Sequence, residues 1–269
     1  MLAIKNNLMA ANAARYLGQS YDALGTSVER LSSGLRINSA ADDAAGMAVR
    51  ELMRADIAVL QQGARNAQDG VSMLQTMEGA LQVIDNLLIR MQQLAEQAST
   101  GSYTSTQRDI MNNEFTEMAS EIDRIATATN FNGIGMLDNS AVVKIHFGDS
   151  SDQICVAGSN MTASGLSINS LSITGQTNAI SALGSITSAI ETKDTARAKF
   201  GYTINRLEST GEVLGIQAEN LLAAESRISD VDVATEMATL TRNQVLAQAG
   251  TSMLAQANSI PQMALTLLR

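Results

Sequence analysis

Apolar residues recur at alternating intervals of three and four along three separate stretches of this chain. This spacing places the apolar side chains on one face of a helix, and a face of that length packs along a partner helix. The sequence therefore predicts long helices that lie side by side. The stretches are Leu17, Tyr21, Leu24, Val28, Leu31 and Leu35; Leu74, Met77, Leu81, Ile84, Leu88, Met91 and Ala95; and Met111, Phe115, Met118, Ile122 and Ile125.

The pattern changes in the middle of the chain. Between about 138 and 178, short apolar runs are separated by Gly, Ser, Asp and Asn, which predicts strands and hairpins at 142–147, 154–156 and 166–173. The predicted fold class is mainly α: a long antiparallel α-helical coiled-coil hairpin with a small β-hairpin region in the middle of the chain. The helices are expected at about 4–35, up to 62, 66–97, 106–128, 179–221 and 231–257.

One long heptad register is interrupted by charge. From Leu183 to Leu221 the apolar positions follow one another without a break, except that Lys193 and Arg197 occupy two of them. A single proline, Pro261, leaves the helices otherwise uninterrupted.

Composition excludes several classes of partner. The 18 basic and 27 acidic residues give a net charge of −9, so we expect neither a nucleic-acid nor an anionic membrane partner. The sequence contains no run of 18 apolar residues, which is the length that a membrane-spanning helix needs. At the N-terminus, no basic stretch is followed by an apolar one, so we expect no cleaved signal peptide.

The residues that could carry chemistry are isolated. His146 is the one histidine and Cys155 the one cysteine, so no metal-ligating set is expected, and neither has a sequence neighbour that would make a catalytic pair. Gly34, Gly46 and Gly63 follow no strand in the pattern of a phosphate-binding loop. We therefore expect no enzyme activity and no cofactor.

The terminal helices hold few large apolar residues. Two such helices alone bury too little area to offset the entropy of ordering them, so we expect them to be ordered only in an assembly. This favours a structural polymer. A secreted ligand or adhesin that merely displays a surface is the alternative.

Four segments resemble bacterial flagellin, the subunit of the flagellar filament. They are LSSGLRINSAADDAAGMAVR from Leu31, ARNAQDGVSMLQTMEGAL from Ala64, EIDRIATATNFNG from Glu121 and ESRISDVDVATEMATLTRNQVLAQAGTSMLAQANSIPQ from Glu225. The resemblance implies a short form that lacks the variable outer domains. It implies N- and C-terminal helices of an inner-tube domain at 1–44 and 227–269, helices of an outer rod domain at 45–137 and 179–226, and the β-hairpin region at 138–178 between them.

The resemblance also implies partners. A flagellin forms a homopolymer of many copies for motility, is exported unfolded by the flagellar type III apparatus and lies outside the cell. Its expected partners are a secretion chaperone, a flagellar cap protein and the hook-filament junction protein. The junction protein itself, which has similar terminal helices, is the alternative identity within the polymer class.

A stripe on the third predicted helix is a candidate recognition surface. Leu87, Arg90 and Leu94 share one helical face, which the spacing places outside the core and which could touch an adjacent subunit. In flagellins the matching segment binds the host Toll-like receptor for flagellin, and the resemblance carries that role to Arg90, Leu94 and Glu114. Residues 89, 92 and 93 are Ile, Gln and Gln where polar and charged residues are common, which implies reduced affinity.

Two further sets of residues follow from the resemblance. The leucine-rich end with Leu265, Leu267 and Leu268 implies burial against the tube lining and sensing by cytosolic immune receptors. O-linked sugars are common on such flagellins, and the candidate acceptors, which are otherwise plain turn residues, are Ser150, Ser151, Thr162 and Ser164.

Overall fold

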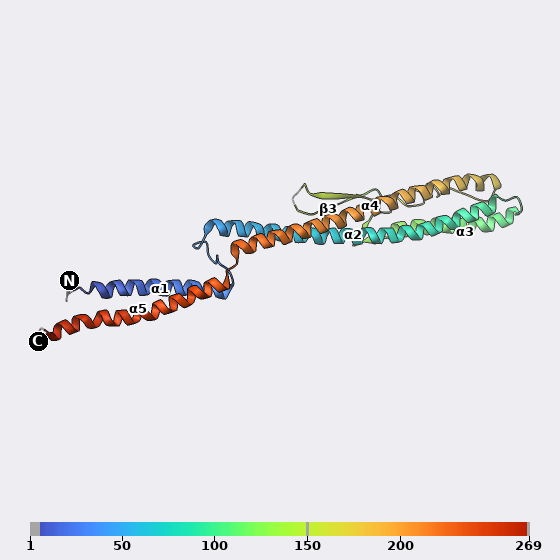
Figure 1. The fold of residues 1–269 in the computed structure, drawn as a ribbon. Coiled ribbons are helices and arrows are strands. Elements are labelled where there is room, and N and C mark those ends of the chain that lie inside the picture. The colour runs from blue at the N-terminus through green and yellow to red at the C-terminus, as the bar shows by residue number, and fades with distance from the viewer. Residues whose placement is uncertain (1–5, 149–150, 268–269) are drawn as a thin grey trace. The chain divides into compact units, whose positions relative to one another are not determined.

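The computed structural model describes residues 6–148 and 151–267, and the predicted mainly α fold is confirmed (Figure 1). The described chain divides into two compact units: unit 1 comprises Met1–Ile57 and Glu219–Arg269, and unit 2 comprises Ala58–Ala218. The elements are α1 (Leu8–Ser33), α2 (Ala44–Ser99), α3 (Ser105–Ala128), β1 (Asn130–Phe131), β2 (Ile134–Gly135), β3 (Val142–His146), β4 (Gln153–Ala157), α4 (Gln176–Ser229) and α5 (Val233–Leu267).

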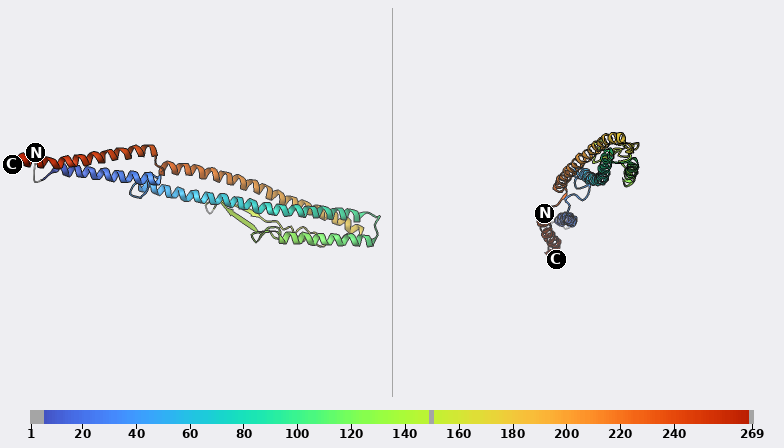
Figure 2. Two further views of the ribbon diagram at one scale, coloured as in Figure 1. Left: turned by 90° about the horizontal axis from the view of Figure 1, so that it is seen from below. Right: turned by 90° about the vertical axis from the view of Figure 1, so that its right-hand side faces the viewer.

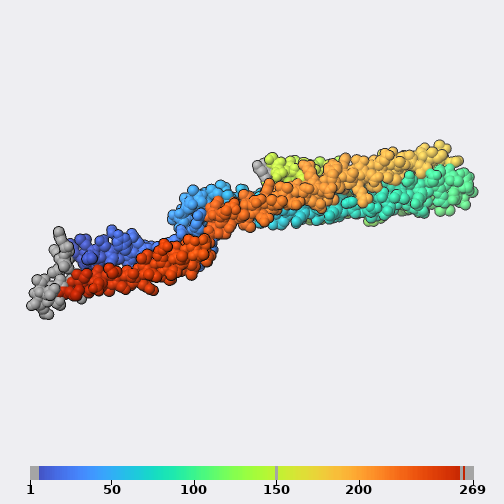
Figure 3. All heavy atoms as spheres, viewed as in Figure 1, coloured from blue at the N-terminus to red at the C-terminus, as the bar shows by residue number. Residues whose placement is uncertain are grey.

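Unit 2 is a bundle in which α2, α3 and α4 lie side by side (Figures 1 and 2). The whole apolar stripe from Leu74 to Ala95 has no exposed area, as the heptad spacing predicts. It packs in one cluster with Phe115 of α3 and Phe200 of α4. Figure 3 shows α4 in close contact with α2 along this unit. The antiparallel coiled-coil hairpin is therefore confirmed.

The predicted break between a second and a third helix near residues 62–66 is wrong, because α2 runs without interruption from Ala44 to Ser99. Gly63 and Gly70 lie inside this helix and serve close packing. A Cβ atom at Gly63 would lie 2.1 Å from the carbonyl oxygen of Phe147, and one at Gly70 would lie 2.4 Å from Cδ1 of Ile145. The chain at the end of β3 therefore rests directly on the α2 backbone.

The middle of the chain holds two small hairpins among its described residues. β3 pairs antiparallel with β4, with Val143 opposite Val156 and Ile145 opposite Ile154, so two of the three predicted strands are confirmed. The short pair β1–β2 was not predicted. Its turn residues Asn132 and Gly133 both have positive φ, which is typical of an Asn-Gly hairpin turn.

The third predicted strand, at 166–173, is wrong. This segment forms turns that bury Leu166, Ile168 and Ile173. Within it, Asn112 Oδ1 of α3 accepts a hydrogen bond from the Ile173 N–H at 2.9 Å, and just before it, Asp123 Oδ1 of α3 accepts one from the Ala163 N–H at 2.6 Å. Because turn hydrogen bonds, such as that from the Ile168 N–H to the Ala163 carbonyl, and Asn112 of α3 satisfy these backbone groups, the segment needs no neighbouring strand.

In unit 1, α1 and α5 run antiparallel, with Asn7 beside Ala257 at one end and Arg30 beside Glu236 at the other. α1 begins at an Asn7 cap, whose Oδ1 accepts a hydrogen bond from the Ala10 N–H, and ends at Gly34 in the left-handed region. The predicted end of the last helix near residue 257 is wrong, since α5 continues past Pro261 to Leu267. A proline removes one backbone hydrogen bond, and that loss did not end the helix here.

Candidate functional site

The α1–α5 pair leaves much of its apolar surface open. The only buried residue of α1 is Ser27, and those of α5 with a described side chain are Ala247 and Ala257. Large apolar side chains stand in solvent on both helices, so this pair has apolar surface for other molecules to cover. These exposed residues, here called the open face, are Leu8, Met9, Tyr16, Tyr21, Val28, Val233, Met237, Val245, Leu246, Met253 and Met263.

Small residues bring the two helices together. A Cβ atom added to Gly250 would lie 3.1 Å from Cδ1 of Leu17, so the helices meet at a glycine. Beside this contact a shallow groove is lined by Ala13, Tyr16, Leu17, Ser20, Leu246, Ala249, Gly250 and Met253. Contacts between small residues bury little area, and the pair alone therefore gains little free energy from packing.

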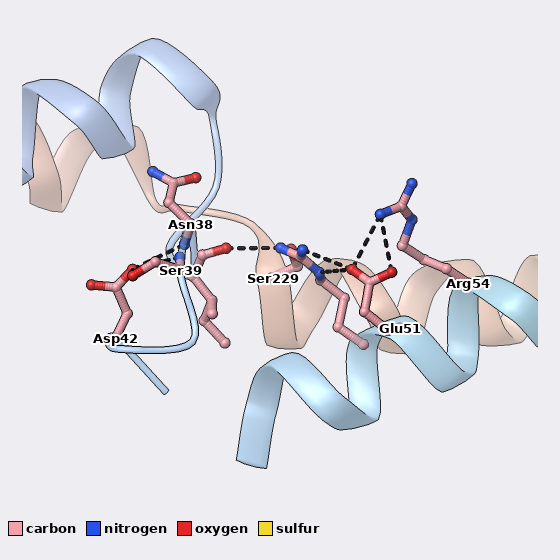
Figure 4. A network of polar contacts seen from close by, with 8 residues as sticks. Asn38, Ser39, Asp42, Glu51, Arg54 and Ser229 are labelled. Carbon is pink, nitrogen blue, oxygen red and sulfur yellow. Dashed lines mark hydrogen bonds and ion pairs between the residues drawn. The ribbon is translucent and has the colours of Figure 1, made fainter. Parts of the chain in front are cut away.

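Near Ser229, a polar network joins the loop before α2, the first turns of α2 and the end of α4. Arg50 is 7% exposed, and its guanidinium donates to the Ile37 carbonyl at 2.8 Å and to the Ser229 hydroxyl at 3.4 Å. Nη2 of the same guanidinium lies 2.8 Å from Glu51 Oε1, and Glu51 also forms an ion pair with Arg54 (Figure 4). The hydrogen bond from Arg50 holds the pKa of the Glu51 carboxyl below its ordinary value.

The loop before α2 is closed by a carboxylate. Asp42 accepts hydrogen bonds from the backbone N–H groups of Ser39 at 2.9 Å and Asn38 at 3.1 Å, and from the Ser39 hydroxyl (Figure 4). The Ser39 backbone N–H is the largest cause that lowers the pKa of Asp42. The sequence did not predict the role of Arg50, because no local pattern distinguishes it from other arginines on helix surfaces.

The candidate recognition residues come together only in part. Arg90 of α2 and Glu114 of α3 form an ion pair with 2.9 Å between Nη2 and Oε1, and their side chains are 48% and 44% exposed. The expectation that Leu94 lies outside the core is wrong, because Leu94 is 2% exposed. Leu94 belongs to the same buried cluster as Phe115 of α3 and Phe200 of α4, so burial on α2 extends beyond the stripe that the heptad spacing predicts.

The candidate sugar acceptors differ in their surroundings. Ser151 and Ser164 are exposed, and Ser150 lies outside the described residues. Thr162 is half-buried, and its hydroxyl donates to Asn160 Oδ1 at 2.7 Å and accepts from the Gly165 N–H at 3.1 Å. Thr162 is therefore the least available of the described candidates.

Other expected features are placed as follows. Leu265 and Leu267 belong to α5, although their side chains lie outside the described part, as does the whole of Leu268. His146 and Cys155 are exposed on the β3–β4 hairpin. In the described residues, no three His, Cys, Asp or Glu side chains gather as metal ligands would. None of the helices, over the described residues, has the length and apolarity needed to cross a membrane.

Both ends of the chain match family patterns. Residues 4–142 match the bacterial flagellin N-terminal helical region, and residues 183–268 match the bacterial flagellin C-terminal helical region. The chain is 42% identical to a flagellin of Halalkalibacterium halodurans over 99% of both chains. It is 40% identical to the flagellar filament 33 kDa core protein of Treponema phagedenis and 38% identical to a Bacillus subtilis flagellin, each over 99% of both chains.

Solved structures agree with these relatives. The crystal structure of Bacillus cereus flagellin superposes with a TM-score of 0.51 at 33% identity, covering 60% of this chain and 94% of that one. A putative flagellar hook-associated protein from Vibrio parahaemolyticus reaches a TM-score of 0.59 at 15% identity, over 70% of this chain and all of that one. At that identity the second likeness concerns the fold alone.

Proposed function

Because this chain belongs to the bacterial flagellin family and is a structural subunit of the flagellar filament, we propose that copies of it polymerise through the open face of α1 and α5. The observation that carries this proposal is that unit 1 leaves large side chains such as Tyr16, Leu246 and Met253 in solvent, at 62%, 50% and 62% exposure. Neighbouring subunits would cover them and supply the area that the α1–α5 pair lacks.

The test places a charge on the open face. We expect Leu246→Glu to abolish filaments seen by electron microscopy and to leave the helical content measured by circular dichroism unchanged, because a buried unpaired carboxylate is costly only in the polymer. Gln244→Glu, at an exposed polar position of the same helix, is the matched control. Filaments of ordinary length from the Leu246 variant would overturn the proposal.

The route to the filament is part of the same proposal. Family members form an extracellular filament, and we propose that this subunit is exported unfolded by the flagellar type III apparatus and added beneath a cap protein, above the hook-filament junction protein. A secretion chaperone would hold α5 through the exposed stripe Val245, Ala249 and Met253, an amphipathic face that fits a groove. Subunit in the culture medium of cells without that export apparatus would contradict this route.

Receptor recognition is a second proposal, carried by the ion pair between Arg90 and Glu114. Both side chains are open to a partner, and Leu94 beneath them would act by supporting α2 and α3. We expect Arg90→Ala to weaken activation of the host Toll-like receptor by monomer about tenfold or more, roughly 1.4 kcal/mol, because interface arginines often dominate binding. Arg124→Ala is the control, since Arg124 also forms an exposed ion pair on α3. Equal activation by both variants would refute the role of Arg90.

Two further proposals rest on the resemblance of this chain to other flagellins. Replacing Leu265, Leu267 and Leu268 together with Ala is expected to abolish both assembly and cytosolic immune sensing, and retained sensing would contradict it. O-linked sugars on the exposed Ser151 and Ser164 would raise the intact mass of the native protein above the 28.4 kDa of the chain. A mass equal to that of the chain would end the second proposal.

A further inference from the structure

A lysine lies in the apolar seam between α2 and α4. The Lys193 side chain is 3% exposed, although lysine is rarely buried unless it is paired. Its Nζ lies 2.5 Å from Asp85 Oδ1 on the facing helix α2 and 2.6 Å from Asp194 Oδ1 on its own helix. Burial acts to lower the pKa of Lys193, but hydrogen bonds and the charges of Asp194 and Asp85 outweigh burial and raise it. The lysine is therefore charged and held by α2.

A second ion pair joins the same two helices one turn away. Arg197 Nε lies 3.2 Å from Glu78 Oε1, and both side chains are about one-third exposed, at 39% and 36%. Because the helices are antiparallel, moving forward from Lys193 to Arg197 on α4 corresponds to moving back from Asp85 to Glu78 on α2. The two pairs together mark one alignment of the helices.

The apolar seam itself discriminates poorly between alignments that differ by seven residues. On α2, Leu74, Leu81 and Leu88 follow one another at intervals of seven, and so do Met77, Ile84 and Met91. On α4, Ala182, Ala189 and Ala196 are also seven apart and buried. A slip of one heptad therefore places leucine where leucine was and alanine where alanine was along these lines. The second buried line of α4, with Ile186, Lys193, Phe200 and Leu207, stays apolar at every position except Lys193.

The ion pairs separate these alignments. A slip in one direction brings Lys193 to Glu78 but leaves Arg197 facing Val71. A slip in the other direction brings Arg197 to Asp85 but leaves Lys193 buried opposite Gln92. Of the three alignments, only the native one pairs both cations with carboxylates on α2.

We infer that the pairs Lys193–Asp85 and Arg197–Glu78 fix the register of α2 against α4, and that the apolar seam, whose positions largely repeat every seven residues, mainly supplies the stability of their contact. Polar residues at single seam positions of coiled coils set register in this way, at a cost in stability. The inference goes beyond polymerisation, because it concerns how the subunit selects one fold.

The test measures the alignment directly. Spin labels at Gln75 and Thr187 in the full chain, with Cys155→Ser, report the axial offset of exposed positions on the two helices. In the native register that offset is about 24 Å, and a slip of one heptad changes it by about 10 Å at 1.5 Å per residue. Electron–electron double resonance resolves such a change.

Two variants make the inference falsifiable. The neutral variant combines Asp85→Asn, Glu78→Gln, Lys193→Met and Arg197→Gln, and we expect it to show a second distance population beside the native one. The transposed variant, Glu78→Gln with Gln92→Glu, keeps the total charge and pairs both cations only after a slip. We expect its main population to lengthen by about 10 Å. The transposed variant decides the matter if the neutral one does not fold.

The matched control neutralises an ion pair outside the seam. Glu121→Gln with Arg124→Gln removes an exposed pair on α3, and we expect the distance to remain single and native. A single native distance in the transposed variant, and in the neutral variant where it folds, would overturn the inference, since the seam or the connecting segments would then suffice to set the register.

Discussion

At the scale of single residues, the number of helices around α2 decides which side chains are buried. The heptad spacing identified the stripe that faces α4, and that stripe has no exposed area. Leu94 lies outside this stripe and was expected at the surface, but it is buried in the cluster that α2 forms with residues of α3 and α4. A periodic pattern reports the angular position of a side chain and does not report how many neighbours surround the helix.

The burial of Leu94 gives the first prediction. We expect Leu94→Ala to lower the free energy of unfolding by about 2–5 kcal/mol, because it leaves a cavity in the buried cluster of unit 2. Arg90→Ala, which removes an exposed ion pair, should cost no more than about 1 kcal/mol. Urea denaturation followed by circular dichroism measures both values. A loss of receptor activation by the Leu94 variant is therefore attributable to recognition only where the fold is intact.

The Asp42 loop gives a prediction on pH. The pKa of Asp42 is lowered in the folded chain by the N–H groups of Ser39 and Asn38, so its contribution is present above the ordinary pKa of aspartate, about 3.9, and is lost as the pH falls through the lowered value. We expect the exchange protection of these two amides to fall below pH 4 relative to that of the neighbouring helices. Asp42→Asn should remove this pH dependence, and an unchanged profile in that variant would count against the assignment.

At the scale of elements, the sequence predicted the helical stretches and their antiparallel packing, but it divided α2 in two and ended α5 too early. Regular spacing sufficed for α1, α3 and the β3–β4 hairpin, because each repeats a local pattern several times. It failed near Gly63, where a glycine reads as a break but serves a close contact with Phe147. It also failed at 166–173, where turn hydrogen bonds and Asn112 of α3 take the place of a partner strand. Both failures concern contacts between residues far apart in the chain.

In the candidate site, too, some residues were predicted from the sequence and others were not. The resemblance to flagellins groups Arg90 with Glu114, and in the structure these two residues form an exposed ion pair between α2 and α3. The buried Arg50 was not predicted, because its hydrogen-bond partners, the Ile37 carbonyl and the Ser229 hydroxyl, belong to other segments of the chain. A polar contact of this kind has no periodic signal in the sequence.

The contact between Gly63 and the end of β3 gives a prediction at this scale. We expect Gly63→Ala to destabilise unit 2 by about 1–3 kcal/mol, because the new methyl group meets a backbone carbonyl that has to shift. Gly79→Ala is the matched control in the same helix, with open space around it, and should stabilise by about 0.5–1 kcal/mol. Thermal unfolding of the two variants compares them. Equal stabilisation by both substitutions would show that β3 does not rest on Gly63.

At the scale of the whole molecule, the two units differ in how their stability arises. Unit 2 buries one continuous apolar cluster from three helices and two hairpins. In unit 1, α1 contributes only Ser27 to the buried residues, and large apolar groups remain in solvent. One chain thus combines a unit with a closed apolar core and a unit whose exposed apolar surface other copies would cover in the proposed filament contact.

This difference predicts the order of unfolding. In the monomer, we expect amides of α1 and α5 to exchange with solvent at least about tenfold faster than those of α2 at Leu74–Ala95, because local opening costs least where few apolar contacts are lost. In the filament, the amides of α1 and α5 should become protected. Hydrogen exchange with mass spectrometry on both forms measures this, and equal protection of both units in the monomer would contradict it.

The open face of unit 1 also bears on the kinetics of growth. We expect a free subunit to order α1 and α5 as it attaches and to offset that loss of entropy only when several neighbours are already in place. The first small cluster is therefore the least favourable species, and a solution of subunits stays supersaturated until it forms. Short filament fragments, which present completed neighbours at their ends, should abolish the lag phase at the same subunit concentration.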